Sequence, residues 1–372
     1  MKHLLSHLAC PSHLVLIVLA VLALGGCAYC PAPMEDTDSP DPRLLYLHDL
    51  ALGQWQVFAL QPGMGEPSQL TDAEHGVFDF ALSVDGTAIV YSALREDGGA
   101  DLWAVGVDGT NQRRLLACPG ARCTAPTCSP DGRIAYERHE TMGDTAGVPR
   151  IWLLDPDGGG TEPLFASETR TGFAPRWSPD PLHLRLAYVD ETESAVRVYD
   201  VGDKSSTLIP AMSDLSAVWG PTSERLVVID ARLSDVGLLS QFWLADVDKG
   251  TLVNISGGDR APVEDMWPAW SPSGEWIAFT RRMLAGDDAT MGQQLWLMRS
   301  DGSDAHPLVV DATATFSRVA WRPDGGALAY VRRPLTNPNA RPELWLLELP
   351  DGEPVLLAEA STAPVWVSRV AQ

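Results

Sequence analysis

Arginines recur directly after the predicted β-strands of this chain, and their side chains are its most suggestive chemical groups. A guanidinium binds a carboxylate or a phosphate through two parallel hydrogen bonds. We therefore expect an anionic ligand or an acidic partner segment at these arginines; ion pairing between neighbouring sheets with the abundant aspartates and glutamates is the alternative. The candidates are Arg138, Arg232, Arg281, Arg282, Arg332 and Arg333 after strands, with Arg95 in the same setting, and Arg176 and Arg318 on predicted inner strands.

The segments that follow these arginines favour a binding face. Residues 138–149, 281–293 and 332–342 are the longest predicted loops, and long loops on a rigid fold often carry binding residues. The predicted inner strands add Asp79 as a further charged group and Trp267 as an exposed aromatic candidate. Aromatic residues there would favour a glycan or another small ligand.

The cysteines divide between the N-terminus and one short loop. Cys118 and Cys123 are five residues apart, and in an oxidising compartment we expect a disulfide between them. A Cys123–Cys128 pair is the alternative, although Cys128 fits a buried thiol better. Cys30 is left over, and its state is open.

We recognise no catalytic set in the sequence. The histidines are scattered, and the Asp-rich turn at Asp155-Pro-Asp157 lacks the ligand spacing of a calcium loop. A Gly-x-Ser-x-Gly nucleophile motif does not occur. We therefore predict no catalytic residues, no metal and no cofactor.

The N-terminus has the pattern of an export signal. Leu14 to Leu24 is an unbroken apolar run, too short to span a bilayer. Leu24-Gly25-Gly26-Cys27 follows and resembles a bacterial lipobox, which implies cleavage after residue 26 and lipidation of Cys27. An ordinary signal peptide is the alternative. Ala28, the residue after this cysteine, favours a location at the outer membrane, facing the periplasm. We expect three parts of the chain: residues 1–26 as signal peptide, 27–42 as a Pro- and Asp-rich tether and 43–372 as the body.

The body is built from a repeated pair of short phrases. One is a Trp-Ser-Pro-Asp-Gly turn before an apolar strand, and the other is an apolar-Trp strand that ends in Asp-Gly. Pro and Asp-Gly suit tight turns, and Trp suits a wide apolar plug between stacked sheets. The position of the first Trp, which we call the anchor, recurs 42 to 51 residues apart at Leu82, Cys128, Trp177, Trp219, Trp270, Trp321 and Trp366.

A period of this length with four short strands predicts an all-β propeller. The anchors end the predicted inner strands, and the first repeat lacks an inner strand at its N-terminal end. Residues 363–367 supply one, so we expect the two ends of the body to share one blade. The count is then seven blades of four antiparallel strands, with six as the alternative.

The two phrases resemble the WD40-like repeats of TolB-type β-propellers. Trp270-Ser-Pro-Ser-Gly274, Trp321-Arg-Pro-Asp-Gly325 and Leu344-Trp345 to Asp351-Gly352 carry the resemblance, which extends over about residues 43 to 370. TolB has six blades and an additional α/β domain, for which no segment fits here. Similar repeats precede the catalytic domain of prolyl-oligopeptidase-like peptidases, and we expect no such domain in this chain.

Composition excludes one class of partner and leaves others open. Asp and Glu number 49 against 27 Lys and Arg, a net charge of −22, so nucleic acid is not an expected partner. The predicted function is a non-catalytic, envelope-anchored scaffold, monomeric, that contacts the membrane through its lipid alone and binds an envelope protein or a peptidoglycan-associated partner. The alternatives are a binder of small anions or glycans and a propeller enzyme of the lyase or glycosidase type.

Overall fold

The computed structural model describes residues 42–142, 145–167, 170–211, 217–234, 237–258 and 261–367. The chain divides into two compact units, residues 1–40 and residues 41–372, and every described residue belongs to the second. The predicted signal peptide, Cys27, Cys30 and almost all of the tether lie outside the described residues. No helix within the described ranges is long and apolar enough to cross a membrane.

The regular structure of the described residues consists of β-strands arranged in sheets, each in hydrogen-bonding order. One sheet holds β28 (Ser361–Trp366), β1 (Leu44–Asp49), β2 (Trp55–Gln61) and β3 (Met64–Gln69). Two groups of strands share a sheet, in which β8 pairs with β6 and β7 pairs only with β6. The first group is β4 (Val77–Leu82), β5 (Ala88–Leu94), β6 (Ala100–Gly106) and β7 (Arg113–Leu116), and the second is β8 (Ala121–Cys128), β9 (Ile134–Met142), β10 (Thr145–Leu154) and β11 (Thr161–Pro163). Two further sheets hold β12 (Phe173–Trp177), β13 (Arg185–Asp190), β14 (Ala195–Asp200) and β15 (Ser206–Ile209), and β16 (Val218–Trp219), β17 (Arg225–Ser234), β18 (Gly237–Asp246) and β19 (Thr251–Asn254). The last two hold β20 (Val263–Trp270), β21 (Trp276–Met283), β22 (Gln294–Arg299) and β23 (His306–Val309), and β24 (Ala314–Trp321), β25 (Ala327–Pro334), β26 (Glu343–Glu348) and β27 (Val355–Glu359).

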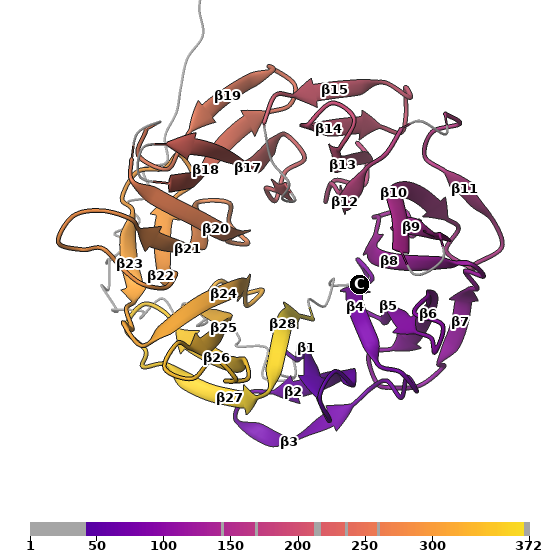
Figure 1. The fold of residues 1–372 in the computed structure, drawn as a ribbon, viewed down its shortest axis with the longest axis horizontal. Coiled ribbons are helices and arrows are strands. Elements are labelled where there is room, and N and C mark those ends of the chain that lie inside the picture. The colour runs from indigo at the N-terminus through magenta and orange to yellow at the C-terminus, as the bar shows by residue number, and fades with distance from the viewer. Residues whose placement is uncertain are drawn as a thin grey trace, which may run out of the picture. The chain divides into compact units, whose positions relative to one another are not determined.

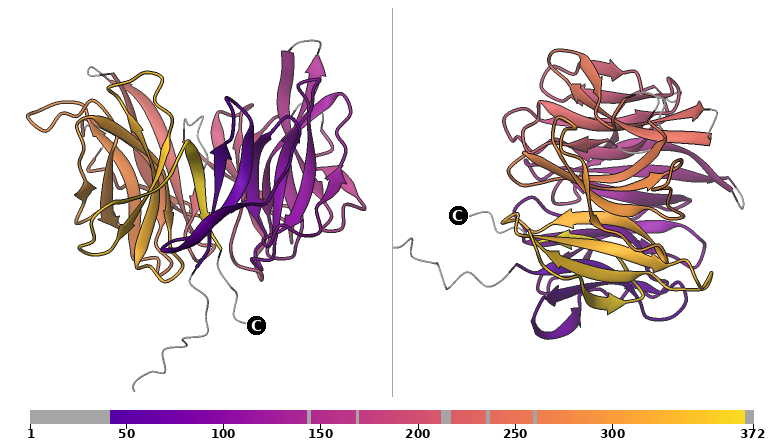
Figure 2. Two further views of the ribbon diagram at one scale, coloured as in Figure 1. Left: turned by 90° about the horizontal axis from the view of Figure 1, so that it is seen from below. Right: turned by 90° about the vertical axis from the view of Figure 1, so that its left-hand side faces the viewer.

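The sheets stand around a common axis (Figure 1). Strands β4, β8, β12, β20, β24 and β28 lie nearest that axis, and we call them the inner strands. Viewed from the side, the strands run between the two faces of the body (Figure 2). Strand β28 pairs with β1, with Leu44 opposite Trp366, so the two ends of the body meet in one sheet. The all-β prediction is therefore confirmed.

The Pro-Asp-Gly phrases form the predicted hairpin corners. Between β8 and β9, the amide of Gly132 donates to the Ser129 carbonyl at 3.0 Å, and the Ser129 amide donates to the Arg133 carbonyl at 2.8 Å. Gly132 has a φ of +90°, which a residue with a Cβ rarely adopts. The turn therefore requires glycine at its last corner.

The anchor tryptophans do more than fill space between sheets. The indole N–H of four anchors donates to the carbonyl of the residue just before the anchor position in the preceding sheet, whereas that of Trp177 has no partner among the described residues. This bond fixes the spacing of neighbouring inner strands while the ring packs in the apolar layer. The bonds are Trp219 to Arg176 (2.9 Å), Trp270 to Val218 (3.3 Å), Trp321 to Ala269 (2.9 Å) and Trp366 to Ala320 (3.3 Å).

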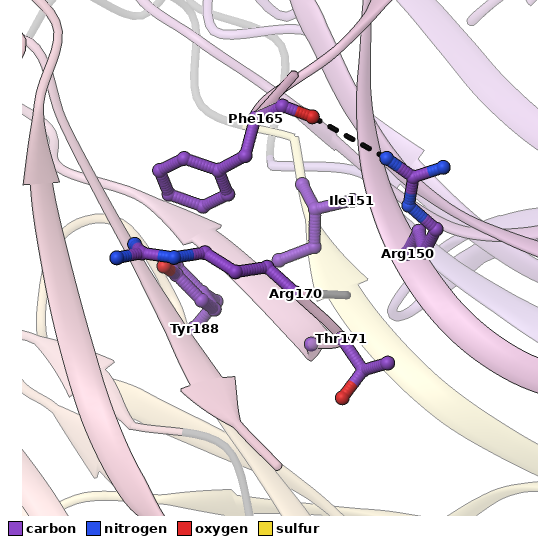
Figure 3. Close-up of a pocket in the computed structure, with 7 residues that line it drawn as sticks. Arg150, Ile151, Phe165, Arg170, Thr171 and Tyr188 are labelled. Carbon is purple, nitrogen blue, oxygen red and sulfur yellow. Dashed lines mark hydrogen bonds between the residues drawn. The ribbon is translucent and has the colours of Figure 1, made fainter. Parts of the chain in front are cut away.

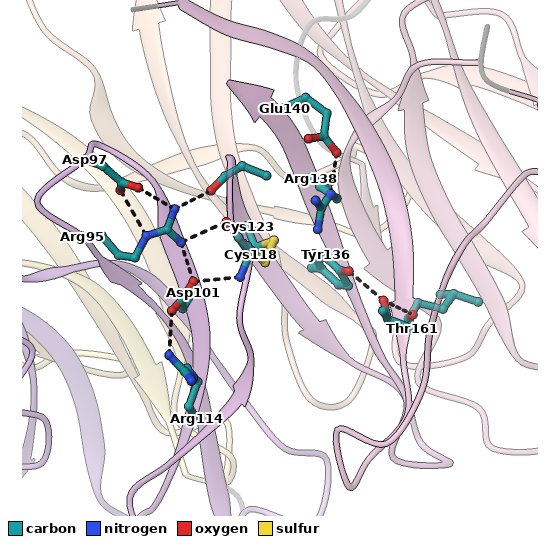
Figure 4. The surroundings of a disulfide bond; sticks show 12 residues. Arg95, Asp97, Asp101, Arg114, Cys118, Cys123, Tyr136, Arg138, Glu140 and Thr161 are labelled. Atoms are coloured by element: carbon teal, nitrogen blue, oxygen red, sulfur yellow. Dashed lines mark hydrogen bonds and ion pairs between the residues drawn. A yellow bond between two sulfur atoms is a disulfide. The ribbon is translucent and has the colours of Figure 1, made fainter. Parts of the chain in front are cut away.

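A disulfide joins Cys118 to Cys123, with 6.3 Å between the Cα atoms, and this is the first of the two pairings considered for the loop. The loop leads into β8 and is held from the side by Arg95, which donates to the carbonyls of Cys118 and Ala121 (Figure 4). Asp101 accepts from the Cys118 amide at 2.9 Å and pairs with the same Arg95. The disulfide thus belongs to a fixed corner that positions the start of an inner strand.

Replacing Cys118 and Cys123 together by serine should lower the free energy of unfolding by about 2 kcal/mol, because a short covalent loop no longer restricts the unfolded chain. Urea denaturation of the described body measures the change. Cys128→Ala, which removes the free thiol, is the control for cysteine loss alone. Equal urea midpoints for the double variant and the wild type would contradict the prediction.

Candidate functional site

Four of the arginines that follow the strands, which we expected to bind an anionic ligand, have carboxylate partners in the structure. Arg281 forms two hydrogen bonds with Asp265, at 2.6 and 2.7 Å. Arg332 contacts Asp311 at 2.7 Å and Glu343 at 2.8 Å. Arg282 pairs with Glu264 at 2.7 Å, and Arg138 pairs with Glu140 at 2.6 Å.

The physical reason is strand register. Asp265 stands directly opposite Arg281 in the β20–β21 ladder, and Glu343 stands opposite Arg332 in the β25–β26 ladder. Opposite charges at such positions pair across strands. The pairs of Arg281 with Asp265, Arg282 with Glu264 and Arg332 with Glu343 therefore form within one sheet rather than between neighbouring sheets. Arg333 is exposed, and the side chain of Arg232 lies outside the described part of the structure.

A different set of residues gathers around the axis. On most inner strands, a bulge interrupts the pairing with the next strand. The bulge lies close to the residue three places before the anchor, and we call this residue the bulge position. Bulges re-aim side chains, and here the residues lie on the strands nearest the axis. The bulge positions hold Asp79, Ala125, Ala174, Trp267, Arg318 and Ala363, and all but Asp79 have φ values between +50° and +55°.

Asp79 is the first titratable group of this axial site. Its carboxylate accepts hydrogen bonds from the Ser92 hydroxyl and, at 2.7 Å, from the amide of Ala125 in the neighbouring inner strand. Burial raises the pKa of Asp79 to about 6, and the negative charge of Glu137 adds to the rise. The two hydrogen bonds and the charge of Arg176 act in the opposite direction. A carboxyl group with such a pKa exchanges a proton near neutral pH, as a general base or acid must.

Glu137 is the second carboxylate, and it orients a histidine. One of its oxygens accepts from the Ala174 amide at 2.6 Å, and the other lies 3.0 Å from Nε2 of His139. Both side chains are mostly buried, with 13% and 20% exposure. A carboxylate bonded to one ring nitrogen fixes the orientation of an imidazole and leaves the second nitrogen for another partner.

Two guanidiniums complete the axial site without carboxylate partners. Arg176 donates to the carbonyl of Pro175 at 2.8 Å, and neither Arg176 nor Arg318 forms an ion pair within the described ranges. Burial lowers the pKa of Arg176, while the charges of Glu137 and Asp79 oppose that change. Arg318 is accessible to solvent. The surrounding protein nevertheless removes part of its hydration and so lowers the pKa of Arg318, while the negative charge of Asp79 opposes that change. Asp79 thus interacts electrostatically with Glu137 and with both arginines.

Aromatic rings flank the axial charges. The guanidinium of Arg122 lies 4.0 Å from the centroid of the Phe78 ring, and that of Arg318 lies 4.9 Å from Trp267. Phe78 is 48% exposed and Trp267 is 38% exposed. Exposed aromatic rings beside unpaired cations and titratable carboxylates are typical of ligand sites rather than of a folding core.

A small cavity elsewhere is too narrow to compete as a substrate site. It lies beside Arg150, Phe165, Arg170 and Tyr188 (Figure 3) and has a volume of about 10 Å³, enough for one water molecule. The buried Tyr188 hydroxyl has no hydrogen-bond partner among the described residues. The described residues contain no cluster of three His, Cys, Asp or Glu that could hold a metal ion.

Sequence reasoning found part of this site. It placed Asp79, Arg176, Arg318 and Trp267 on inner strands but missed Glu137, His139, Phe78 and Arg122. A signal for Glu137 was present: it follows Ile-Ala-Tyr in β9, where the corresponding positions of other strands hold Val189, Thr280 and Val331. A charged residue at a position where other strands carry uncharged residues indicates a role other than packing.

Comparison with known proteins places the fold among β-propellers. No family model matches the chain. A Bacillus subtilis (strain 168) protein described as an uncharacterized peptidase, YuxL, is 24% identical over 214 residues, 47% of this chain and 32% of that protein. The chain thus spans about a third of that relative's length.

Solved structures share the architecture at low sequence identity. A structure from an analysis of two prolyl endopeptidases has a TM-score of 0.60, 15% identity and 85% and 48% coverage of this chain and that chain. An oligogalacturonate lyase of Vibrio parahaemolyticus has a TM-score of 0.57, 10% identity and 86% and 85% coverage. TolB of Acinetobacter baumannii has a TM-score of 0.50, 13% identity and 88% and 66% coverage. These likenesses support the TolB-like propeller fold.

These comparisons also correct the functional expectation. The prediction of a non-catalytic scaffold, and of a chain that is not an enzyme, is contradicted because the matching relative is described as a peptidase and two of these structures are a peptidase and a lyase. The alternative of a propeller enzyme agrees better with them.

Proposed function

We propose that this chain is a propeller enzyme whose axial site cleaves an anionic oligosaccharide by elimination, as a lyase does. One observation carries the proposal: Asp79, with a pKa of about 6, lies within electrostatic reach of Arg176 and Arg318, which lack carboxylate partners. The likeness to the oligogalacturonate lyase supports it, since the shared fold covers 86% of this chain and 85% of that chain. Fold alone does not carry activity, so the argument depends on the chemistry of the site.

Elimination needs a cation for the substrate carboxylate and a base for the neighbouring carbon. Arg176 binds the carboxylate and offsets the negative charge that develops as the carbon loses its proton. The ionised carboxylate of Asp79 accepts that proton. A carbon–carbon double bond forms while the carbon–oxygen bond to the next sugar breaks, and the departing oxygen takes a proton from His139, which Glu137 holds in place. No water is added.

The proposal includes a finer reading of the fold. We infer seven blades of four strands, with β28 completing the blade of β1 to β3 and the eight-stranded sheet counted as two blades. The pairing of β28 with β1 supports this count, as does the single parallel bridge, Ala100 to Arg122, that joins the two halves of the larger sheet. The repeats accordingly belong with the WD40-like repeats of TolB-type propellers.

Peptide hydrolysis is the second candidate, favoured by the 24% identity to YuxL. One Ser–His contact is present: Nδ1 of His48 lies 3.0 Å from the Ser361 hydroxyl. Ser361 is fully buried and donates its proton to the Glu359 carbonyl, so it is poorly placed to attack a substrate. The axial site is therefore the better supported centre.

The test is a comparison of substrates with two readouts. The purified body is incubated with a galacturonate trimer, its methyl ester, a neutral glucose trimer and a set of peptides. Elimination gives ultraviolet-absorbing products whose masses sum to that of the substrate, whereas hydrolysis adds one water per bond. Cleavage of the acidic trimer with the first signature supports the proposal. Hydrolysis of peptides alone, or of no substrate, overturns it.

The compartment is part of the same proposal. We propose that the chain is exported, that Cys27 is lipidated and that the body faces the periplasm from the outer membrane. Cys27→Ala should abolish incorporation of labelled palmitate and move the protein from the membrane to the soluble envelope fraction in a bacterial host. Cys30→Ala is the control, and unchanged labelling of the Cys27 variant would contradict lipidation there. An envelope protein or peptidoglycan-associated partner stays a prediction.

A further inference from the structure

Two bulge positions hold side chains that their backbone conformation disfavours. Trp267 in β20 has a φ of +55°, and Arg318 in β24 has a φ of +50°. Residues with large side chains rarely adopt this conformation, because Cβ crowds the backbone. Alanine occupies three of the other bulge positions, with φ values from +50° to +55°. A bulky indole is therefore not needed to form the bulge.

The surroundings of Trp267 hold this strained conformation. Asp265, two residues earlier, is fully buried and clamped by Arg281. The next residue, Met266, accepts a hydrogen bond on its carbonyl from the Thr280 hydroxyl at 3.2 Å. The strand is thus fixed directly before the bulge, and strain maintained in this way is common at ligand sites.

The two side chains form one surface. The Arg318 guanidinium lies over the Trp267 ring, 4.9 Å from its centroid, so the cation is in contact with one face of the indole. Trp267 is 38% exposed, and Arg318 is exposed. Arg318 has no ion pair within the described residues, although acids outnumber basic residues 49 to 27 in the chain. A solvent-accessible cation left without a carboxylate in so acidic a protein is available to an external anion.

We propose that Trp267 and Arg318 form a subsite for one hexuronate residue of an acidic oligosaccharide. The indole packs against the apolar C–H face of the sugar ring, and the guanidinium binds its carboxylate. The sugar in this subsite neighbours the one that reacts at Asp79 and Arg176. The inference rests on the proposed function and deepens it, because it assigns substrate choice to residues outside the proton-transfer steps.

The subsite is tested by calorimetric titration of the full body with a galacturonate trimer and with its methyl ester. Trp267→Ala should weaken binding of both ligands about tenfold, because stacking does not depend on charge. Trp267→Phe should restore most of that loss. Arg318→Gln should weaken binding of the acidic trimer alone, so that the preference for acid over ester becomes smaller, while Arg176 keeps the part that comes from the reacting sugar.

Arg299→Gln is the matched control, because Arg299 also lies over a tryptophan ring but away from the axis. Its guanidinium, on β22, lies 4.1 Å from the ring centroid of Trp276 on β21. This variant should leave both affinities unchanged. The subsite is overturned if Trp267→Ala and Arg318→Gln bind both ligands like the wild type, or if Trp267-dependent binding is seen only with peptides. Thermal melts separate misfolding from lost binding, and Trp267→Phe remains testable if Trp267→Ala does not fold.

The outcomes distinguish the subsite from the proposed activity. If the wild type cleaves the trimer by elimination while the variants bind and cleave it equally well, the subsite is wrong and the activity stands. If the variants show the expected pattern of affinities but no uronate is cleaved, the subsite stands and elimination is wrong.

Discussion

Asp79→Asn should lower kcat for elimination by about 10²- to 10⁴-fold, the usual contribution of a positioned general base. The amide can keep the local structure, because its oxygen accepts from the Ala125 amide and its NH₂ donates to the Ser92 oxygen. The loss should therefore concern proton transfer rather than folding. Initial rates with the galacturonate trimer measure it, and a variant with wild-type kcat would show that Asp79 is not the base.

The pH dependence gives this prediction a second readout. Since the pKa of Asp79 is raised to about 6, the wild-type rate should fall as pH decreases through 6 and the carboxylate becomes protonated. Residual activity of Asp79→Asn should lack that limb. An identical acidic limb in variant and wild type would assign it to another group.

Stability should change in the opposite sense to activity. The folded protein holds the Asp79 proton more tightly than the unfolded chain, so this group stabilises the fold at low pH and loses that contribution as pH rises through about 6. Asp79→Asn should therefore gain stability relative to the wild type over that range. Asp85→Asn is the control, because the Ser83 hydroxyl lowers the pKa of that exposed aspartate.

Arg281→Met should destabilise the body by about 3–5 kcal/mol, the largest stability effect we expect from a single substitution. Asp265 is fully buried and Arg281 is 8% exposed, so removal of the guanidinium leaves a buried carboxylate without its partner. Methionine can still pack against Phe279 and Trp296, whose ring centroids lie 5.1 Å from the guanidinium. The loss is therefore electrostatic rather than a loss of volume.

Urea denaturation of single and double variants tests this account. Asp265→Leu combined with Arg281→Met should recover most of the stability, because no unpaired charge remains. Lys249→Met should leave the urea midpoint close to that of the wild type, since the Lys249 ammonium that pairs with Asp246 is exposed. A wild-type urea midpoint for Arg281→Met would contradict a stabilising pair. These results would also establish that Arg281 serves the fold rather than a ligand.

The sequence by itself determined the repeat and much of the architecture. The Trp and Pro-Asp-Gly phrases predicted the inner strands, the hairpin corners and the shared sheet of β1 and β28. They could do so because turns and buried strands depend on residues that are close in the sequence. The same positions placed Asp79, Arg176 and Arg318 near the axis. Neither the anchor hydrogen bonds nor the conformation of the bulge positions could be derived, because both depend on how neighbouring sheets pack.

Only the tertiary structure decided which charges are paired. Arg281 and Arg332 looked available in the sequence, yet strand register places Asp265 and Glu343 opposite them. Glu137 looked like one acid among many, until packing of neighbouring sheets brought the Ala174 amide to it. A charged residue is free or paired according to contacts distant in the sequence, and a pattern of residue types cannot express those contacts. The tertiary structure thus moved the candidate site from the loops at the strand ends to the axis.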